Sequence, residues 1–316
     1  MAKVTVALLS WNQGAFVRES LESILSQDFA DFDLIVIDNA STDASPQLIA
    51  RALDTHDHSF RSRFIRNDCN VGINAALNQA LRHADSDYFI SFAADDVMHP
   101  NRLRHQTELF NSFPGSVGAL ASACRKIDSN GVEKELMLSP SYRNLEDQRR
   151  QLLRMRIPLA PATVFRTSDL VSLNGFDERS AVEDFDTFLR LTFVLGKEIR
   201  TDHQVVTHYR WHGQNNSSKS EVMKGVVPYS LARISDQRLS RAEKRFLKRT
   251  LVQAVDPSLP WESLVAALAS TETVPTFRIR GLAIRVIFST GLPVVNRLKA
   301  TLAALAPRTS AKRVGH

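Results

Sequence analysis

Short apolar runs alternate with amphipathic stretches through the first hundred residues of the chain. The apolar runs, which are typical of strands buried on both faces, lie at residues 4–9, 34–37, 64–65 and 88–92. Between them, apolar side chains recur at helical spacing, as at Val17, Leu21 and Ile24. This alternation predicts βαβ units, and therefore an α/β fold with a Rossmann-like, mostly parallel sheet that is flanked by helices.

The pattern is less regular beyond residue 100. The expected elements are a helix over 103–110, a strand over 117–123, an irregular charged stretch over 129–151, a helix over 185–193 and a strand over 205–209. The polar cluster at residues 213–220 predicts a loop that ends this body. We therefore predict one domain over residues 1–215, followed by a helical C-terminal region over residues 216–316.

The composition is that of a globular protein and disfavours two kinds of site. Apolar residues make up 43% of the 316 positions and charged residues 23%, which is sufficient for a buried core. Cys69 and Cys124 are the only cysteines and lack CxxC spacing, so neither a disulfide scaffold nor structural zinc is expected. The chain contains neither GxGxxG nor GxxxxGK[ST], which argues against a glycine-rich phosphate loop.

The net charge of +6 is concentrated at the C-terminus. Residues 275–316 hold eight Lys or Arg and no Asp or Glu, which leaves the rest of the chain near −2. Nucleic acid is therefore not the expected partner of the whole protein. Basic and apolar residues interleave along this tail, so it either lies in an anionic membrane surface or packs on the body with a solvated basic face.

The sequence contains no apolar run of membrane-spanning length and no leader pattern at its start. We therefore expect a cytoplasmic protein. If the tail binds lipid, the protein is peripheral on the cytoplasmic face of the inner membrane.

Unusual polar residues follow three of the expected strands. Ser10, Trp11 and Asn12 follow the first strand, Asp38 and Asn39 the second, and Asp95 and Asp96 the fourth. Ligands of open α/β sheets bind at the carboxyl ends of the strands, where these residues should meet. Adjacent carboxylates repel each other unless a cation neutralises them, and Mg²⁺ or Mn²⁺ would suit oxygen ligands. The alternative is a helix-capping pair ahead of Pro100.

Several blocks, in order, resemble the family 2 glycosyltransferases of the GT-A fold, and the SpsA-like group in particular. They are VTVALLSWN at 4–12, SLESILSQ at 20–27, DFDLIVIDNASTD at 31–43, NVGINAALN at 70–78, DYFISFAADD at 87–96, NGFDE at 174–178, EDFDTFLRL at 183–191 and YRWHGQNNS at 209–217. The resemblance covers about two thirds of the chain. It implies that residues 1–215 form a nucleotide-sugar-binding catalytic domain.

The resemblance also implies roles for individual residues. The residues that it implies for metal binding are Asp95, Asp96 and His212. Nucleotide-sugar binding falls to Ser10, Trp11, Asn12, Asp38, Asn39, Asp43, Asn70, Gly72, Asn78, Asp95, Glu183 and Arg210, with Trp11 stacking on the base. Asp38 and Asp43 could instead be turn residues. The chain departs from the family pattern at Asn39 and Ala93, where many members have aspartate, and at Leu77, where a basic residue is common.

Asp184 is the catalytic residue that the resemblance implies, as the general base that deprotonates an acceptor hydroxyl. The alternative is that Glu183 and Asp184 only favour the start of a helix by their charge. The implied activity is an inverting, metal-dependent transfer with Mg²⁺ or Mn²⁺. It would move a sugar from a nucleoside diphosphate, with UDP or dTDP favoured, to a glycan or lipid-linked acceptor, and surface polysaccharide synthesis is the implied process.

Two other function classes compete with this hypothesis. A sugar nucleotidyltransferase usually has a glycine-rich basic loop after its first strand, whereas residues 10–15 contain one Gly and no Lys or Arg. A non-catalytic nucleotide-binding or carbohydrate-binding protein of the same fold would tolerate Asn39 and Ala93, but would have little need for both acidic pairs.

Overall fold

The computed structural model describes residues 2–55, 60–180, 182–213, 215, 230 and 234. The predicted helical region over 216–316 therefore lies outside the described residues, apart from Ser230 and Ile234, and so does the whole basic tail. Both of these side chains are buried, and Ile234 belongs to a core cluster of the main body. No helix within the described ranges is long and apolar enough to cross a membrane.

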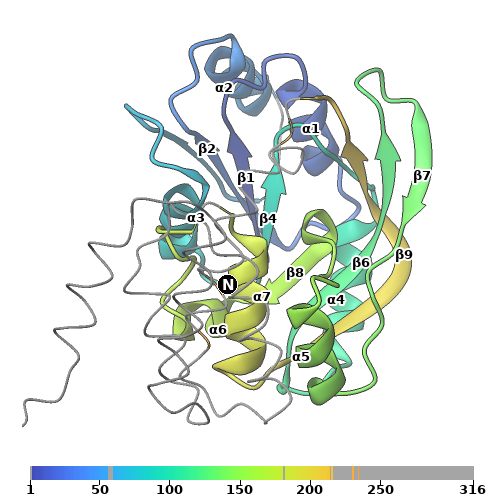
Figure 1. The fold of residues 1–316 in the computed structure, drawn as a ribbon. Coiled ribbons are helices and arrows are strands. Elements are labelled where there is room, and N and C mark those ends of the chain that lie inside the picture. The colour runs from blue at the N-terminus through green and yellow to red at the C-terminus, as the bar shows by residue number, and fades with distance from the viewer. Residues whose placement is uncertain are drawn as a thin grey trace, which may run out of the picture.

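The first half of the sheet has the predicted βαβ architecture. Its strands are β1 (Ala2–Ser10), β2 (Phe32–Asp38), β3 (Ser62–Arg66) and β4 (Ser86–Ala93), alternating with helices α1 (Val17–Leu25), α2 (Ser45–Thr55) and α3 (Ile73–His83). The four strands are parallel in the order β3-β2-β1-β4, so their carboxyl ends share one edge, at the top of Figure 1.

The second half makes the sheet mixed rather than mostly parallel. Its elements are β5 (Val97–Met98), α4 (Arg102–Asn111), β6 (Val117–Ile127), β7 (Glu133–Met137), α5 (Leu145–Leu153), the 3-10 turn η1 (Ala160–Ala162), β8 (Thr163–Arg166), α6 (Thr167–Ser172), α7 (Asp184–Phe193) and β9 (Glu198–Arg210). The sheet continues as β4-β8-β6-β9-β5, and β8 is antiparallel to both of its neighbours. β8 leaves a turn that already lies at the carboxyl edge of β4, so it must run away from that edge.

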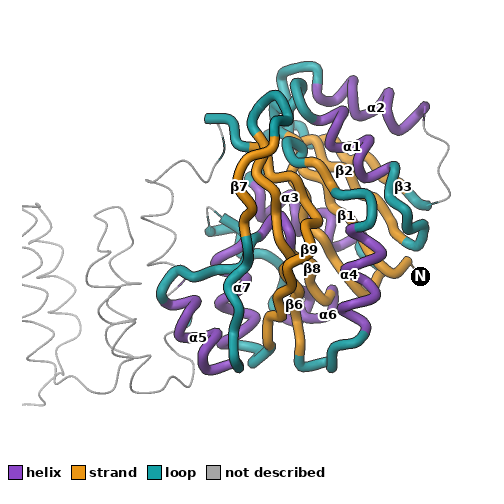
Figure 2. The backbone as a smooth tube through the Cα atoms, turned by 90° about the vertical axis from the view of Figure 1, so that its right-hand side faces the viewer, coloured by secondary structure: helices purple, strands orange, loops and turns teal. Residues whose placement is uncertain are grey.

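Two apolar clusters cover the two faces of the sheet. On β1, Val4, Val6 and Leu8 point to the cluster that holds the apolar residues of α1, whereas Ala7 points to the cluster that holds those of α3 and α7. This alternation is the period-two geometry of a strand that is buried on both faces. Figure 2 shows α1, α2 and α4 on one side of the sheet, with α5 and α7 on the other.

The expectation of an irregular stretch over 129–151 was wrong, because β7 and α5 both lie within it. β7 has the sequence EKELM and exposes four of its five residues, so it has no buried face to produce an apolar pattern. α5 did carry a local signal. The side chain of Asn144 accepts a hydrogen bond from the backbone N–H of Asp147, and two acidic residues occupy the first turn.

Candidate functional site

A cavity of about 80 Å³ lies at the carboxyl edge of β1 and β4. Asp96, after β4, lines one part of it, and Glu183 and Asp184, at the start of α7, line another. The remaining walls include Ala93, Phe176 and the η1 residues Ala160 and Pro161. Asp96 and the pair Glu183 and Asp184, which are far apart in the sequence, therefore meet at one cavity.

The acidic turn between β4 and β5 is buried and is held by the end of β9. Asp96 is 1% exposed, and its Oδ1 accepts a hydrogen bond of 2.9 Å from the backbone N–H of Arg210. Oδ2 of Asp95 lies 2.9 Å from Nε2 of His212. Burial, and secondly repulsion from Asp95, raise the pKa of the Asp96 carboxyl well above its usual range. An ionised Asp96 therefore gains from a nearby cation.

Arg210 directs its guanidinium into the protein beneath this turn. Its Nε donates to the carbonyl of Asp95 at 2.8 Å, and one terminal nitrogen donates to Glu19 Oε2 at 2.6 Å. The other terminal nitrogen contacts the carbonyls of Asp128 and Ser129, at 3.3 and 3.4 Å. Arg210 thus organises the acidic turn, and a diphosphate contact by this side chain would require some of these bonds to be exchanged.

His212 and Asn215 complete the surroundings of Asp95. The His212 ring stacks on Phe16 with 5.0 Å between ring centroids, and its backbone N–H donates to Asn215 Oδ1 at 2.7 Å. Of the three predicted metal ligands, Asp95 and His212 contact each other, whereas Asp96 Oδ1 is bound to the backbone N–H of Arg210. Among the described residues, no group of three or more His, Cys, Asp or Glu side chains is arranged to hold a metal ion, so the predicted metal site would need water and substrate oxygens as further ligands and stays a prediction.

Glu183 and Asp184 lie at the other side of the cavity, where α7 begins. Both are partly buried, and burial raises the pKa of each carboxyl. For Glu183, burial and the charge of Asp184 raise the pKa to about 7. A carboxylate with a raised pKa is a stronger base than an ordinary aspartate, and is still ionised in part near neutral pH.

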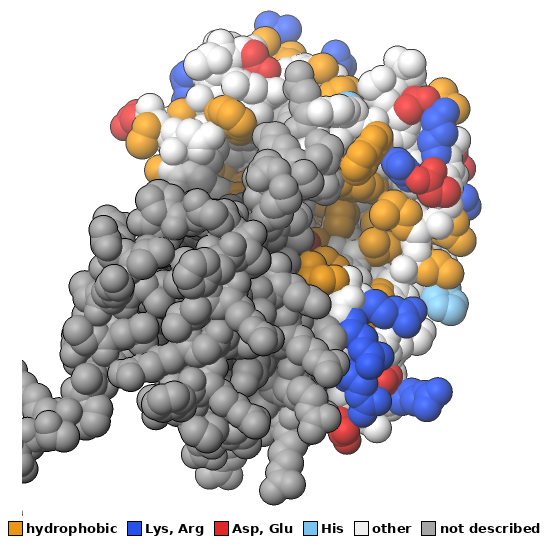
Figure 3. All heavy atoms as spheres, viewed as in Figure 1, with side chains coloured by type: hydrophobic (Ala, Val, Ile, Leu, Met, Phe, Trp, Pro, Cys, Tyr) orange, Lys and Arg blue, Asp and Glu red, His pale blue; other side chains and the backbone are white. Residues whose placement is uncertain are grey.

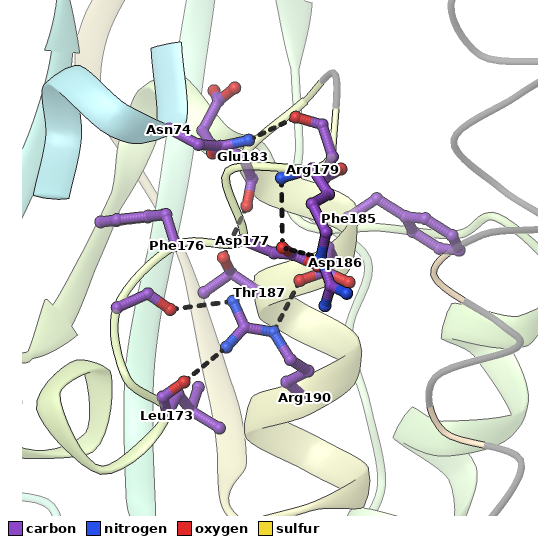
Figure 4. Close-up of polar contacts among 12 residues, drawn as sticks. Asn74, Leu173, Phe176, Asp177, Arg179, Glu183, Phe185, Asp186, Thr187 and Arg190 are labelled. Atoms are coloured by element: carbon purple, nitrogen blue, oxygen red, sulfur yellow. Dashed lines mark hydrogen bonds and ion pairs between the residues drawn. The ribbon is translucent and has the colours of Figure 1, made fainter. Parts of the chain in front are cut away.

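A buried network fixes the position of α7 (Figure 4). Arg190 pairs with Asp186 one turn earlier, at 2.6 Å. Its two remaining nitrogens donate to the carbonyls of Leu173 and Gly175, at 2.9 and 3.0 Å. The turn that precedes α7 is thereby tied to the helix that carries Asp184.

Asn78 ties the same turn to α3. Its side chain donates to the Phe176 carbonyl at 2.9 Å and accepts from the Phe176 N–H at 2.8 Å. Gly175 has φ +75°, and a Cβ there would lie 2.3 Å from Asn78 Oδ1, so only glycine fits. The structure thus places Asn78 against residues 176–178, and its predicted contact with the donor stays a prediction.

The loops after β1 and β2 are joined by side-chain hydrogen bonds. Asn12 has φ +53°, and its Oδ1 accepts from the Thr42 N–H at 2.8 Å. Asp43 accepts from the N–H groups of Gly14 and Ser45, at 2.8 and 2.9 Å. Burial acts to raise the pKa of Asp43, but these hydrogen bonds outweigh it and the pKa lies below its usual value. Asp43 therefore stabilises the turn in this structure, and its predicted contact with the donor stays a prediction.

At this edge of the sheet Trp11 is exposed, whereas Asp38 is buried. The Trp11 side chain is 51% exposed beside the loop, which leaves its ring accessible to a planar base. Asp38 is fully buried, and its Oδ2 accepts from the Ser41 N–H at 3.1 Å. Asp38 Oδ1 and Ser10 Oγ are buried and have no hydrogen-bond partner within the described part of the chain.

Asn39 joins the loop after β2 to the loop before α3. Its Nδ2 donates to Asn70 Oδ1 at 2.9 Å, and its Oδ1 accepts from Asn67 and from the Val71 N–H, at 3.0 and 3.1 Å. An aspartate could not make the first of these bonds, because a carboxylate has no donor. Gly72 follows at the N-cap of α3 with φ +83°, a backbone conformation that favours glycine.

The sequence interpretation missed three residues that surround the acidic turn. Phe16 stacks on His212 and lies under the Arg210 guanidinium, Glu19 pairs with that guanidinium, and Asn215 donates to the Arg210 carbonyl at 2.9 Å. Phe16 and Glu19 lie about 190 positions before Arg210, and no local pattern reports contacts over such a separation. Asn215 lies within the quoted block at 209–217, and nothing else in the sequence indicates its contact with Arg210.

Solved structures of similar fold were found at low sequence identity. S. aureus TarS 1–349 in complex with UDP-GlcNAc aligns with a TM-score of 0.62 and 17% identity, over 85% of this chain and 80% of that one. The mannosyltransferase PcManGT from Pyrobaculum calidifontis, in complex with GDP-Man and Mn²⁺, gives 0.59 and 21%, over 96% and 80%. These likenesses confirm the predicted α/β fold of GT-A type.

Sequence comparison agrees with the fold. WcaA of Escherichia coli (strain K12), whose name assigns it to colanic acid biosynthesis, is 25% identical over 84% of this chain and 93% of its own length. EpsE of Bacillus subtilis (strain 168), a glycosyltransferase by name, is 39% identical over 33% of this chain and 37% of its own. The family model of glycosyl transferase family 2 matches residues 5–170, more than half of the chain. The chain thus belongs to glycosyl transferase family 2, as its sequence blocks predicted.

Proposed function

We propose that this glycosyltransferase inverts the configuration of the sugar that it transfers from a nucleoside diphosphate to an acceptor hydroxyl. The observation that carries the proposal is the single cavity lined by Asp96 on one side and by Glu183 and Asp184 on the other. Direct displacement requires a base and a stabilised leaving group on opposite sides of the anomeric carbon, and this arrangement supplies a carboxylate for each.

Asp184 is the base in this proposal. It takes the proton of the acceptor hydroxyl as that oxygen attacks the anomeric carbon, and no covalent sugar intermediate forms. Burial raises the pKa of Asp184, which favours proton transfer near neutral pH. Arg190 and Asn78 hold the start of α7 in place, so the base is oriented before substrate arrives.

Asp95 and Asp96 would hold Mg²⁺ or Mn²⁺, with His212 beside them. The ion would stabilise the charge that develops on the leaving diphosphate. The burial of Asp96 next to a second carboxylate supports this assignment, because a cation would offset both the burial and the repulsion. The main-chain N–H of Arg210 keeps Asp96 turned toward the end of β9.

The proposed donor is a nucleotide sugar, with UDP or dTDP favoured. Solved structures of the same fold hold UDP-GlcNAc in one case and GDP-Man in another, which supports this class of donor without selecting the base. A relative named for colanic acid biosynthesis supports an acceptor in surface polysaccharide synthesis, either a glycan or a lipid-linked sugar. We place the activity in the cytoplasm, with attachment to the inner membrane surface if the basic tail binds lipid.

The test is a transfer assay in which nucleoside diphosphate release is measured for a panel of nucleotide sugars. We expect one donor to be consumed, with inversion at the anomeric carbon of the product, and we expect exhaustive chelation of divalent ions to stop the reaction. Retained configuration would contradict direct displacement, and full activity after chelation would contradict the metal. Nucleotide binding without any turnover would favour a non-catalytic binding protein.

A further inference from the structure

Away from the carboxylates of Asp96, Glu183 and Asp184, the walls of the cavity are largely apolar. They include the side chains of Leu9, Ile73, Ala93, Pro161, Phe165 and Phe176. Ser91 carries the one hydroxyl among the lining side chains that the structure describes, and none of them carries an N–H group. In Figure 3, hydrophobic side chains line the visible rim of the hollow on this face. A ligand in the cavity therefore meets carboxylates on two sides and an apolar wall elsewhere.

The backbone carbonyls of the η1 wall are engaged within the protein. Pro161 has no N–H group, and its carbonyl accepts hydrogen bonds from Arg102 at 2.8 Å and from Thr207 at 2.9 Å. The carbonyl of Ala160 accepts from the N–H of Thr163. The guanidinium of Arg102 is fully buried, so it serves this wall from inside the protein. The η1 wall therefore offers a ligand the carbon surface of its side chains rather than these carbonyls.

Two further parts of the wall are engaged in the same way. The N–H and the carbonyl of Phe176 are both bonded to the side chain of Asn78. The carbonyl of Ala93 accepts from the N–H of Asp96 at 3.2 Å and from Ser20 Oγ at 3.3 Å. Ala93 also stands where many members of the family have aspartate, so a methyl group replaces a carboxylate at this point of the wall. The departure at Ala93 thus makes the cavity less polar.

The transferred sugar would occupy this cavity in the proposed function. Its anomeric carbon has to lie between the leaving diphosphate, on the side of Asp96, and the base Asp184, and both residues line the cavity. Sugar hydroxyls that face the carboxylates can donate hydrogen bonds to them. A hydroxyl that faces the apolar wall would lose its water without gaining a partner, which is unfavourable, whereas a methyl group there would gain from burial.

We propose that the sugar of the donor is a 6-deoxyhexose, which carries a methyl group where an ordinary hexose has its C6 hydroxymethyl group. This inference rests on the proposed function and specifies its donor. The methyl group would contact the wall that includes Ile73 and Ala93, and the ring hydroxyls would donate to the carboxylates. A 2-acetamido sugar also carries a methyl group, but its amide adds a carbonyl and an N–H that need partners in the same apolar wall.

Binding of matched nucleotide sugars to the full-length chain tests the proposal. The two members of each pair differ only at C6, and the pairs are UDP-6-deoxy-D-glucose with UDP-D-glucose, dTDP-L-rhamnose with dTDP-L-mannose, and GDP-L-fucose with GDP-L-galactose. UDP-GlcNAc and dTDP-GlcNAc are the acetamido probes. Calorimetric titration in the presence of Mn²⁺ measures the affinity of each ligand, and UDP, dTDP and GDP are titrated alone as references.

A double variant of the wall shows whether the cavity causes the preference. Ile73→Thr with Ala93→Ser gives the wall two hydroxyl groups at nearly unchanged volume. Ala75→Ser is the matched control, because Ala75 lies on α3 like Ile73 but is not among the residues that line the cavity. Both proteins should bind the nucleoside diphosphate alone as tightly as the unmodified protein does, since neither changes a residue assigned to the nucleotide.

We expect the 6-deoxy member of at least one pair to bind about tenfold or more tightly than its 6-hydroxy partner. The double variant should reduce this ratio by about threefold or more, and the control should keep it. Equal affinities within every pair would overturn the proposal, and so would tighter binding of an acetamido probe than of the 6-deoxy sugar on the same nucleotide. A ratio that the double variant leaves unchanged would overturn the assignment to this wall.

The reference titrations separate this inference from the proposed function. A folded protein that binds none of the three nucleoside diphosphates would contradict the proposed function itself. Binding of a nucleoside diphosphate without any preference at C6 of the sugar would overturn the 6-deoxyhexose inference alone.

Discussion

Glu183 and Asp184 are neighbours in the sequence, but we expect different effects when each carboxyl group is replaced by an amide. Both line the cavity and both have a raised pKa, because burial disfavours the charged form. Asp184 is the first residue of α7, and the base role is assigned to it. For Glu183, the charge of Asp184 adds to the effect of burial on the pKa.

Replacing Asp184 with Asn keeps the shape of the side chain and removes its ability to take a proton. We expect the rate of transfer to fall by roughly 10²–10⁴-fold or more, with nucleotide affinity unchanged. Transfer kinetics and a nucleotide titration on the same sample check this. Asp54→Asn, at an exposed position on α2, is the control. Transfer at the unmodified rate by Asp184→Asn would remove Asp184 as the base.

Glu183→Gln should change how stability depends on pH. The pKa of Glu183 is raised from its ordinary 4.5 to about 7 in the folded protein, so its protonated form is the one that favours folding. That contribution is complete below the ordinary pKa and is lost as pH rises through about 7. Glutamine cannot ionise. Thermal melts should therefore show the variant gaining stability relative to the unmodified protein between about pH 5 and pH 8, and a constant difference would contradict the raised pKa.

At the scale of elements, α7 is positioned by its contacts with the turn before it. Arg190 and Asp186 form a pair that is almost fully buried, and the other donors of Arg190 bond to backbone carbonyls of that turn. Asn78 holds the opposite side of the turn from α3. Helices α7 and α3 are therefore connected through one short segment.

Arg190→Gln should destabilise the protein strongly, because it removes the buried cation that pairs with the Asp186 carboxylate and two hydrogen bonds to the turn before α7. We expect a loss of about 3–5 kcal/mol in the free energy of unfolding. The matched control is Arg150→Gln, which breaks an exposed pair of the same i,i+4 spacing and should cost less than about 1 kcal/mol. Denaturant unfolding of both variants measures the difference, and equal losses would contradict a structural role for the buried pair.

The regular elements were predictable where an apolar periodicity exists, and not where it is absent. The strands β1, β2 and β4 and the helix α7 bury whole runs of side chains, so their patterns were clear. β7 buries almost nothing and β8 has four residues, so neither left a pattern. Antiparallel insertion of β8 depends on where η1 lies in space, and no local sequence determines that.

The candidate site was predictable in its acidic pairs and less so in their surroundings. Asp95 and Asp96 follow a buried strand, and Glu183 and Asp184 begin a buried helix, all within recognisable blocks. The structure brings Asp96 and the second pair to one cavity. The orientation of Arg210 into the interior depends on Glu19 and Phe16, which are distant in sequence. Likewise, the sequence shows Asn39 only as a departure from the family pattern, and the structure shows that its side chain donates a hydrogen bond to Asn70.

For the whole molecule, the proposed function joins the donor, the metal ion and the catalytic base at one edge of the sheet. The loops after β1 and β2 supply Trp11 and Asn39, the turn after β4 supplies the two aspartates, and α7 supplies the base. All of these assignments depend on the binding of a nucleoside diphosphate together with a divalent ion.

The most direct test of this binding is a thermal-shift panel with UDP, dTDP, GDP and CDP, each with and without Mn²⁺. A ligand that binds only the folded protein raises its stability by mass action, so a concentration of about 100 times the Kd adds about 2.7 kcal/mol. The account predicts a shift for one nucleotide that requires Mn²⁺ and is lost in Asp96→Asn. A folded protein that shows no shift with any of the four nucleotides would contradict the account.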